Sequence, residues 1–393
     1  MNFSEDAQES YFFSQPHQPF FVLAFVNAII AMLIFMLAYK GVIHLAIPTV
    51  YFHSYSLIYL LFTPAFTAFL FTTFPRFTST SPIPKETYMR IFSLFYIGTV
   101  LFMLGSIVSP VLAYAGMFTL LAGHGWVYRI LRGIYAKSAI PDNRDVFWIQ
   151  LAMGLGVLSH LIFLIGSLFL PSFTGLGIEM AIYLYLFLLT FSVAQRMVPF
   201  FSHCMAARND RLLPTLFGLL LAHVILEGIY PNASFVIDAS LAFVTLKEIL
   251  RWQLPFPNPN PLLWILHLAL YWVPTAFLMG AMASLTTLVG GPDLLFLDIH
   301  ALMLGFVMTI LIGFGTRVTI GHSGNMMQAG LWEKVLFNFT QLVVVIRLFV
   351  SIAAGFGWDI SVLFDISATV WMLLFVLWAV RFFDVLIRGK KLA

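Results

Sequence analysis

Residues 20–40 read FFVLAFVNAIIAMLIFMLAYK, a run in which Asn27 and Lys40 are the only strongly polar side chains. An α-helix needs about 20 consecutive apolar residues to cross the hydrocarbon core of a bilayer, so this stretch predicts a membrane-spanning helix. The whole chain has the same character. Of its 393 residues, 61% are hydrophobic and 9% are charged, whereas a soluble domain has about 25% charged residues. This composition excludes a soluble enzyme, a disordered chain and a disulfide scaffold.

Eleven further runs of similar apolarity follow along the chain. We therefore expect an all-α integral membrane protein, a bundle of about twelve transmembrane helices. The loops are too short for a separate soluble domain, so residues 1–393 are predicted to form a single polytopic membrane domain with a short cytoplasmic segment at 1–19. Strands are not expected, because the apolar runs are too long and do not alternate. The predicted spans are 20–40, 52–74, 89–108, 110–132, 146–170, 177–199, 213–230, 232–250, 262–288, 295–317, 334–357 and 361–387.

The basic residues predict the orientation of these spans. Eighteen of the 20 Lys and Arg residues lie near the connections that follow even-numbered spans or in the C-terminal tail. Loops rich in Lys and Arg stay in the cytoplasm, so both termini are expected there. The first residues include Glu5, Asp6 and Glu9, where a cleavable signal would carry positive charge. The sequence has no basic stripe of the kind that binds nucleic acid, so no nucleic-acid partner is expected. The apolar runs make the lipid bilayer the expected surroundings of the protein.

The ten histidines are numerous for a chain with so few polar groups. On the predicted topology His53 and His300 lie at the outer face, and His267 and His322 lie near the cytoplasmic side, where His17 is also placed. An interhelical hydrogen bond is the commoner role for any single buried histidine, but for the five intramembrane histidines of the chain taken together we favour cofactor ligation. No Cys-x-x-Cys-His motif occurs, which excludes covalently attached c-type haem.

Arg347 lies near the middle of its predicted span, and two interpretations of it carry equal weight. One is an ion pair with Asp365, Glu227 or Asp238. The other is a clamp for an anionic group such as a haem propionate, because Arg suits bidentate recognition of carboxylates.

Asp298 stands two residues before His300. It is more simply explained as an interfacial aspartate at a helix N-terminus than as a partner of that imidazole, because residues i and i+2 do not face each other on a helix.

Two C-terminal motifs carry a resemblance to a known family. Residues 298–305 read DIHALMLG and residues 316–324 read TRVTIGHSG. They resemble the His-Ala-Leu…Gly and Thr-Arg…Gly-His-Thr-Gly motifs of the NnrS family. Looser similarities run in the same order along nearly the whole chain, at 19–21, 52–53 with 68–75, 195–201 and 261–269.

The resemblance implies a twelve-helix protein of the bacterial inner membrane that contains haem and copper and is linked to nitric oxide metabolism and nitrosative stress. It points to haem b and to metal ligation by His53, His267, His300 and His322. Their matched depths make His53 with His300 the first choice of ligand pair, and His267 with His322 the second. The resemblance also places Arg196 and Arg317 at the cofactor. Arg347 is a further candidate, because its predicted position near the middle of a span suits a clamp for a haem propionate. Where the family has a second histidine and a following Glu, this chain has Tyr55 and Ser56. Haem is therefore expected more firmly than copper.

The leading hypothesis from the sequence is a haem protein that binds or reduces nitric oxide, which would make it an oxidoreductase. Neither an iron–sulfur motif nor a dinucleotide fingerprint is found, so reduction would require a quinol or a protein electron donor. The alternative is a transporter, or a protein that interacts with quinone or lipid, without a redox metal. It predicts helices broken near the midplane, for which Pro274 is the candidate. A third reading is a haem-delivery or signalling component without turnover.

Overall fold

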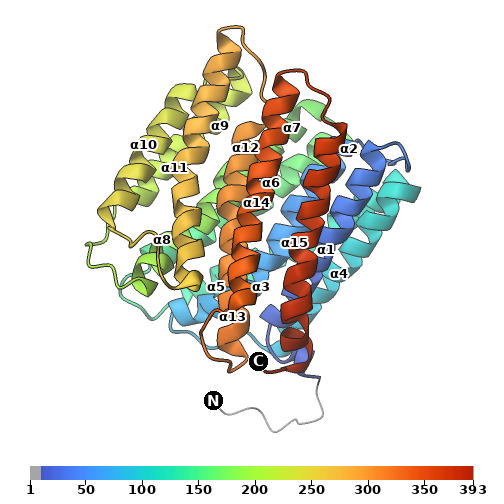
Figure 1. The fold of residues 1–393 in the computed structure, drawn as a ribbon. Coiled ribbons are helices and arrows are strands. Elements are labelled where there is room, and N and C mark those ends of the chain that lie inside the picture. The colour runs from blue at the N-terminus through green and yellow to red at the C-terminus, as the bar shows by residue number, and fades with distance from the viewer. Residues whose placement is uncertain (1–9, 393) are drawn as a thin grey trace. The chain divides into compact units, whose positions relative to one another are not determined.

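The computed structural model describes residues 10–392, and all regular structure in that range is helical (Figure 1). The all-helical prediction is thereby confirmed. The described chain forms two compact units. The first comprises residues up to Asn143, Gly315–Met327 and the chain from Phe375 onward, and the second comprises Arg144–Phe314 and Gln328–Leu374. Helices α13 and α15 each contribute to both units. The acidic N-terminal residues considered above lie outside the described range.

Ten helical segments within residues 10–392 are long and apolar enough to cross a membrane. They are α1 (His17–Tyr39), α2–η2–α3 (Thr49–Phe77), α4 (Lys85–Val108), α6 (Arg144–Leu168), α7–η3–α8 (Pro171–Phe201), α9 (Leu212–Ile229), α11 (Pro261–Leu288), α12–η4–α13 (Leu297–His322), α14 (Leu331–Gly355) and α15 (Ser361–Arg388).

The other two predicted spans are also helices, α5 (Pro110–Ala136) and α10 (Phe235–Arg251), but by length and apolar composition they are not among the ten candidate spans. Helix α10 has 17 residues, four of them charged, and at about 1.5 Å per residue it is shorter than a hydrocarbon core of about 30 Å. Each of the twelve predicted runs is thus a helix, and ten of them are candidate spans.

Three of the spans contain a wide π-helical segment that the apolar pattern does not reveal. These segments are η2 (Ser56–Phe62), η3 (Met180–Phe187) and η4 (Ala301–Met308). Buried threonines follow two of them, and their hydroxyls donate to the carbonyl five residues earlier, Thr63 to Ile58 and Thr309 to Leu304. π-Helical turns are rare and often mark functional sites.

Asn27, the polar residue inside the opening run, has a structural role in the first unit. Its side-chain amide donates to the carbonyl of Leu60 at 2.8 Å. Four residues further on, Pro64 has no N–H to occupy that carbonyl. Asn27 is 2% exposed, and its amide joins α1 to η2 by supplying a donor to this carbonyl, since a buried carbonyl without a donor is costly.

In the first unit, α1 packs against α2, η2, α3 and α4, and α4 packs closely against α5 (Figure 1). The start of the described chain and its end lie at one end of this unit. Gly389 is next to the ring of Tyr11, and Lys391 donates to the carbonyl of Ser323. This arrangement agrees with an even number of crossings, while the cytoplasmic location of that end stays a prediction.

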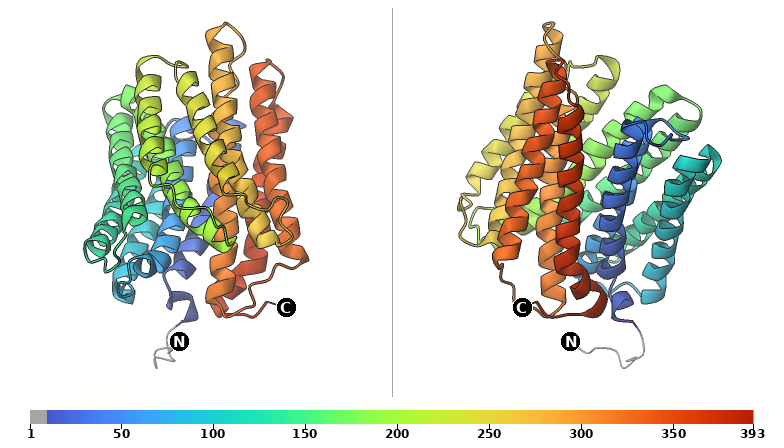
Figure 2. Two further views of the ribbon diagram at one scale, coloured as in Figure 1. Left: turned by 90° about the vertical axis from the view of Figure 1, so that its left-hand side faces the viewer. Right: turned by 45° about the vertical axis from the view of Figure 1, so that its right-hand side comes forward.

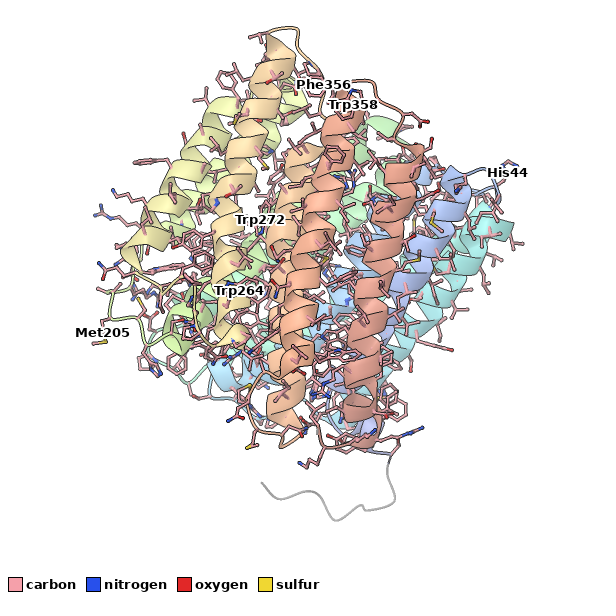
Figure 3. All side chains as sticks on the ribbon, viewed as in Figure 1. His44, Met205, Trp264, Trp272, Phe356 and Trp358 are labelled. Atoms are coloured by element: carbon pink, nitrogen blue, oxygen red, sulfur yellow. The ribbon has the colours of Figure 1, made fainter. Side chains whose placement is uncertain are left out.

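In the second unit, α6 packs against α7, η3 and α8, and α11 packs against α10 and η4 (Figure 2). Figure 3 shows Met205 and Trp358 at opposite ends of this unit, in the α8–α9 and α14–α15 loops. Helix α11 continues from Pro261 to Leu288 through Pro274, so the helix break that the transporter alternative predicts is not found there.

Candidate functional site

The first unit brings two histidines together, one from each end of the chain. His17 begins α1 and His322 ends α13 (Thr309–His322), and their ring centroids are 5.0 Å apart. The Nδ1 atom of His322 is 3.1 Å from the side-chain oxygen of Gln15. Because an amide oxygen only accepts hydrogen bonds, Nδ1 of His322 donates, and its Nε2 then carries a lone pair. A carbonyl partner on one ring nitrogen is typical of histidines that ligate a metal through the other.

The second ring of this pair is buried and incompletely bonded. His17 is 3% exposed, and its Nδ1 has no hydrogen-bond partner among the described residues. The side-chain nitrogen of the neighbouring Gln18, which is 1% exposed, is in the same condition. Buried polar atoms are normally satisfied, so two unsatisfied atoms at one place indicate a water, ion or ligand. An imidazole pair suits haem, because the porphyrin already holds the iron and the protein adds one or two ligands.

His53 lies on α2 (Thr49–Tyr55) in the first unit, where its ring stacks on Phe35 with centroids 4.2 Å apart. The two residues that depart from the family pattern have local structural roles. The Tyr55 hydroxyl donates to the carbonyl of Met117 at 3.3 Å, and the Ser56 hydroxyl donates to the carbonyl of His53 at 3.1 Å. Among the described residues, no group of three or more His, Cys, Asp or Glu side chains is arranged to hold a metal ion.

His300 lies in the second unit at the end of α12 (Leu297–His300), immediately before η4. Its Nδ1 donates to the carbonyl of Phe296 at 2.8 Å, an arrangement that would orient Nε2 for ligation. Phe296 has a φ of 55°, a left-handed conformation that turns the chain into α12. Asp298 accepts a hydrogen bond from the hydroxyl of Tyr183 at 3.1 Å. Asp298 lies in the first turn of α12, the position of an aspartate at a helix N-terminus.

His267 on α11 uses both ring nitrogens within the second unit. Nε2 is 2.6 Å from the Ser202 hydroxyl and Nδ1 is 2.9 Å from the carbonyl of Pro255. The ring is completely buried. This is the bonding of a structural histidine that joins α11 to the loop after α8, and metal ligation by His267 stays a prediction that would require Ser202 to move.

The predicted depth pairs, His53 with His300 and His267 with His322, each combine residues of both units. They stay predictions.

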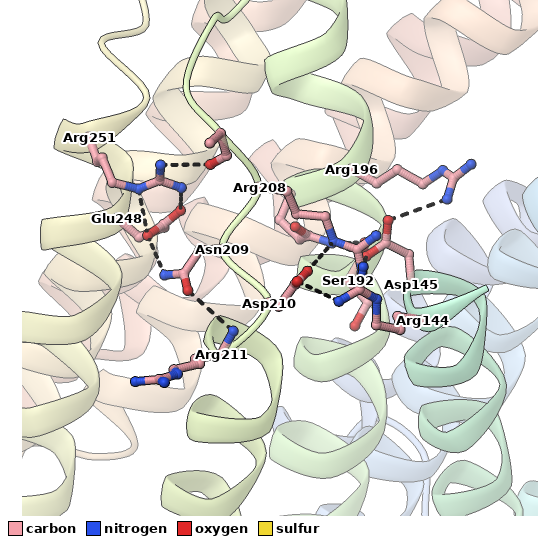
Figure 4. Close-up of polar contacts among 12 residues, drawn as sticks. Arg144, Asp145, Ser192, Arg196, Arg208, Asn209, Asp210, Arg211, Glu248 and Arg251 are labelled. Carbon is pink, nitrogen blue, oxygen red and sulfur yellow. Dashed lines mark hydrogen bonds and ion pairs between the residues drawn. The ribbon is translucent and has the colours of Figure 1, made fainter. Parts of the chain in front are cut away.

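Arg196, near the end of α8 (Leu188–Phe201), belongs to a network of charges at one end of the second unit (Figure 4). Its Nη1 donates to Asp145 at 3.3 Å, and Arg208 donates to the other oxygen of the same carboxylate at 3.1 Å. Gln195 also donates to Asp145, at 2.9 Å. Asp145 therefore ties the start of α6 to the end of α8 and to the following loop, where Arg208 also pairs with Asp210.

Replacing Asp145 with alanine is expected to lower the free energy of unfolding by about 2 kcal/mol, because three donors lose one largely buried acceptor. Thermal unfolding of the detergent-purified protein measures the change. Glu86→Ala is the matched control, since Glu86 pairs with Arg90 on an exposed helix face and such pairs contribute little. Equal stability losses in the two variants would contradict a structural role for the Asp145 network.

The two other predicted arginines are half-buried. Arg317 precedes His322 by five residues on α13, in the first unit. Arg347 on α14 donates to the Ser351 hydroxyl at 2.7 Å, and that hydroxyl donates to the carbonyl of Leu295 at 2.9 Å. Among the described residues, Arg347 forms no ion pair with Asp365, Glu227 or Asp238, so the first of its two interpretations is not supported. The guanidinium stays a candidate partner for an anionic group.

Two clusters were not recognised from the sequence as sites. One is the pair of His17 with His322. The sequence indicated only that both residues lie toward the cytoplasmic side. The other is the contact of His223 with Asp238, which lie 15 residues apart on α9 and α10 with Nδ1 and Oδ1 at 2.7 Å. Neither belongs to a spaced motif, because the partners come from different helices.

A family model described as NnrS protein matches residues 11–390. The match covers nearly the whole described chain, so the resemblance carried by the two C-terminal motifs is confirmed and extends through both units. No curated protein matches the chain.

Proposed function

Because the chain belongs to the NnrS family, we propose that it is a haem b protein of the bacterial inner membrane that binds nitric oxide and so counters nitrosative stress. Membership supports a membrane protein related to nitric oxide, and the ten candidate spans agree with a multi-pass location. The observation that carries the haem assignment is the His17–His322 pair, in which one ring is anchored by Gln15 and the other is buried with an unsatisfied nitrogen.

The residues around this pair suit a haem in three ways. His322 would hold the haem iron through Nε2, and His17 is a neighbouring imidazole. Arg76, at the end of α3 (Thr63–Phe77), is close enough for electrostatic interaction with both rings, and a guanidinium pairs well with a haem carboxylate. Phe21 lies against His17, with ring centroids 6.5 Å apart, and supplies an apolar wall. In the second unit, we propose His300 as a haem ligand and Arg347 as the partner of a haem carboxylate.

When bound, haem supplies an iron centre to which nitric oxide can coordinate. The chain supplies the rest: Gln15 fixes the tautomer and orientation of His322, and His17 lies buried beside it. Reduction of nitric oxide is a further step of the proposal, for which a quinol or a donor protein would supply the electrons. Copper stays a prediction from the resemblance. The transporter alternative loses its specific support because α11 continues through Pro274.

Optical spectra of the detergent-purified protein test the proposal. We expect a b-type haem spectrum that changes on reduction with dithionite and changes again when nitric oxide is added to the reduced protein. A haem spectrum that nitric oxide leaves unchanged would refute coordination at that iron and favour electron transfer. A monodisperse protein without haem would refute the cofactor assignment and make the transporter alternative the leading hypothesis.

A further inference from the structure

A chain of polar side chains joins α7, α9 and α10 inside the second unit. His223 on α9 is 2% exposed, and its Nδ1 is 2.7 Å from Oδ1 of Asp238 on α10, which is also 2% exposed. The Ser234 hydroxyl lies 3.1 Å from the other oxygen of Asp238 and 2.5 Å from a carboxyl oxygen of Glu227. On the far side of the imidazole, Nε2 of His223 is 3.8 Å from Glu179.

The number of hydrogen-bond donors among these side chains indicates an additional proton. The Ser234 hydroxyl has one hydrogen but lies between two carboxyl groups. Glu227 also accepts from the backbone N–H of Asn232 at 3.0 Å. If Ser234 donates to Glu227 and Nδ1 of His223 donates to Asp238, the contact between Ser234 and Asp238 has no donor. One added proton on Asp238 supplies that donor and satisfies all three short contacts.

A cavity adjoins these hydrogen-bonded side chains and gives them access to water. Its volume is about 190 Å³, and Glu179, His223, Glu227 and Ser234 line it. A water molecule takes about 30 Å³ in the liquid, so several fit. Asp293 lines the same cavity, and none of the lining residues is Lys or Arg. The cavity therefore places several carboxyl groups beside one imidazole, a lining whose oxygen and nitrogen atoms can accept a proton and pass it on.

The interior side of the cluster is closed by η3 and α11. The ring of Tyr183 on η3 is 4.1 Å from that of His223, and its hydroxyl donates to Asp298. A Cβ on Gly280 of α11 would lie 3.1 Å from Cβ of Asp298 and 3.6 Å from Oδ2 of Asp238, so the glycine allows α11 to pack directly against the acids. The titratable groups around His223 are thus Glu179 from α7, Tyr183 from η3, Glu227 from α9, Asp238 from α10, Asp293 from the α11–α12 loop and Asp298 from α12.

We propose that this cluster is a proton-uptake site that connects the cavity to the buried His223–Asp238 pair. A hydronium ion in the cavity gives its proton to Glu227 and leaves water. Ser234 accepts that proton from Glu227 while its own hydroxyl proton passes to Asp238, so Glu227 and Ser234 return to their starting states and Asp238 is protonated. Nothing is oxidised or reduced. The inference goes beyond the proposed nitric oxide chemistry and is tested without haem or nitric oxide.

Infrared spectra of the full-length protein in lipid nanodiscs provide the test, at fixed neutral pH and with exchange from H₂O into D₂O. Exposed carboxyl groups have a pKa near 4 and are ionised under these conditions. We expect the C=O band of a protonated carboxyl group that shifts to lower wavenumber in D₂O and disappears in Asp238→Asn. Glu86→Gln, which changes an exposed acid of the first unit, is the matched control and should leave the band unchanged.

Ser234→Ala tests the connection separately and preserves the His223–Asp238 contact. It should keep the band but slow its shift in D₂O about tenfold, the effect of removing one hydrogen bond from the path. The absence of an exchangeable carboxyl band in the unmodified protein would overturn the proposal without any variant. A band that persists in Asp238→Asn would overturn the assignment, and exchange at the unmodified rate in Ser234→Ala would overturn the path.

Discussion

His322→Ala is expected to remove most of the haem absorbance per molecule of purified protein while the protein still inserts and stays monodisperse. The ring of His322 is oriented by Gln15 through Nδ1 and directs no other hydrogen bond to the described residues through Nε2. Its loss therefore takes away a ligand and little packing, since the side chain is half-buried. The ratio of haem absorbance to protein, measured with size-exclusion chromatography, gives the result.

His44→Ala is the matched control for this variant, because His44 is an exposed histidine in the α1–α2 loop of the same unit. It should retain the full haem content. A monodisperse His322→Ala protein with unchanged haem would rule out His322 as a ligand, and attention would move to His300 and His53. His17→Ala is a useful companion variant, because loss of haem or a change in the haem spectrum would show that His17 contributes to the haem site.

Gly116→Ala is expected to destabilise the first unit by about 3 kcal/mol and to lower the yield of monodisperse protein sharply. A Cβ at Gly116 on α5 would lie 2.4 Å from the backbone nitrogen of Phe102 and 2.8 Å from the carbonyl oxygen of Gly98 on α4. Backbone atoms cannot give way as a flexible side chain does, so the two helices would have to separate. Small residues allow this close approach between membrane helices.

Gly125→Ala on the same helix is the matched control, because a Cβ there meets nothing within 4 Å. It should leave the thermal unfolding temperature unchanged or raise it slightly, since Ala favours a helix over Gly. If both variants had the same unfolding temperature as the unmodified protein, the close packing of α4 on α5 would be wrong.

Local composition was sufficient to predict the helices of this protein. The run at 20–40 becomes α1 at His17–Tyr39, and the run at 361–387 becomes α15 at Ser361–Arg388. Apolarity over about 20 residues is a property of one segment, and a backbone in hydrocarbon must bond within itself, so a helix follows without reference to the neighbours. The same local information explains why the family motifs were recognised at 298–305 and 316–324 and were confirmed by a match over 11–390.

The partners of the polar residues could be known only from the folded units. Asn27 bonds to Leu60, Asp145 binds Arg196 and Arg208, and Arg347 bonds to Ser351 instead of any of the three carboxylates considered for it. His17 meets His322 across almost the entire sequence, and Tyr183 on η3 lies against His223 on α9. Hydrophobicity determines that a segment enters the membrane, but a polar contact depends on how each helix is rotated and which helix lies beside it. Those quantities result from packing over a whole unit, and no spacing within one segment encodes them.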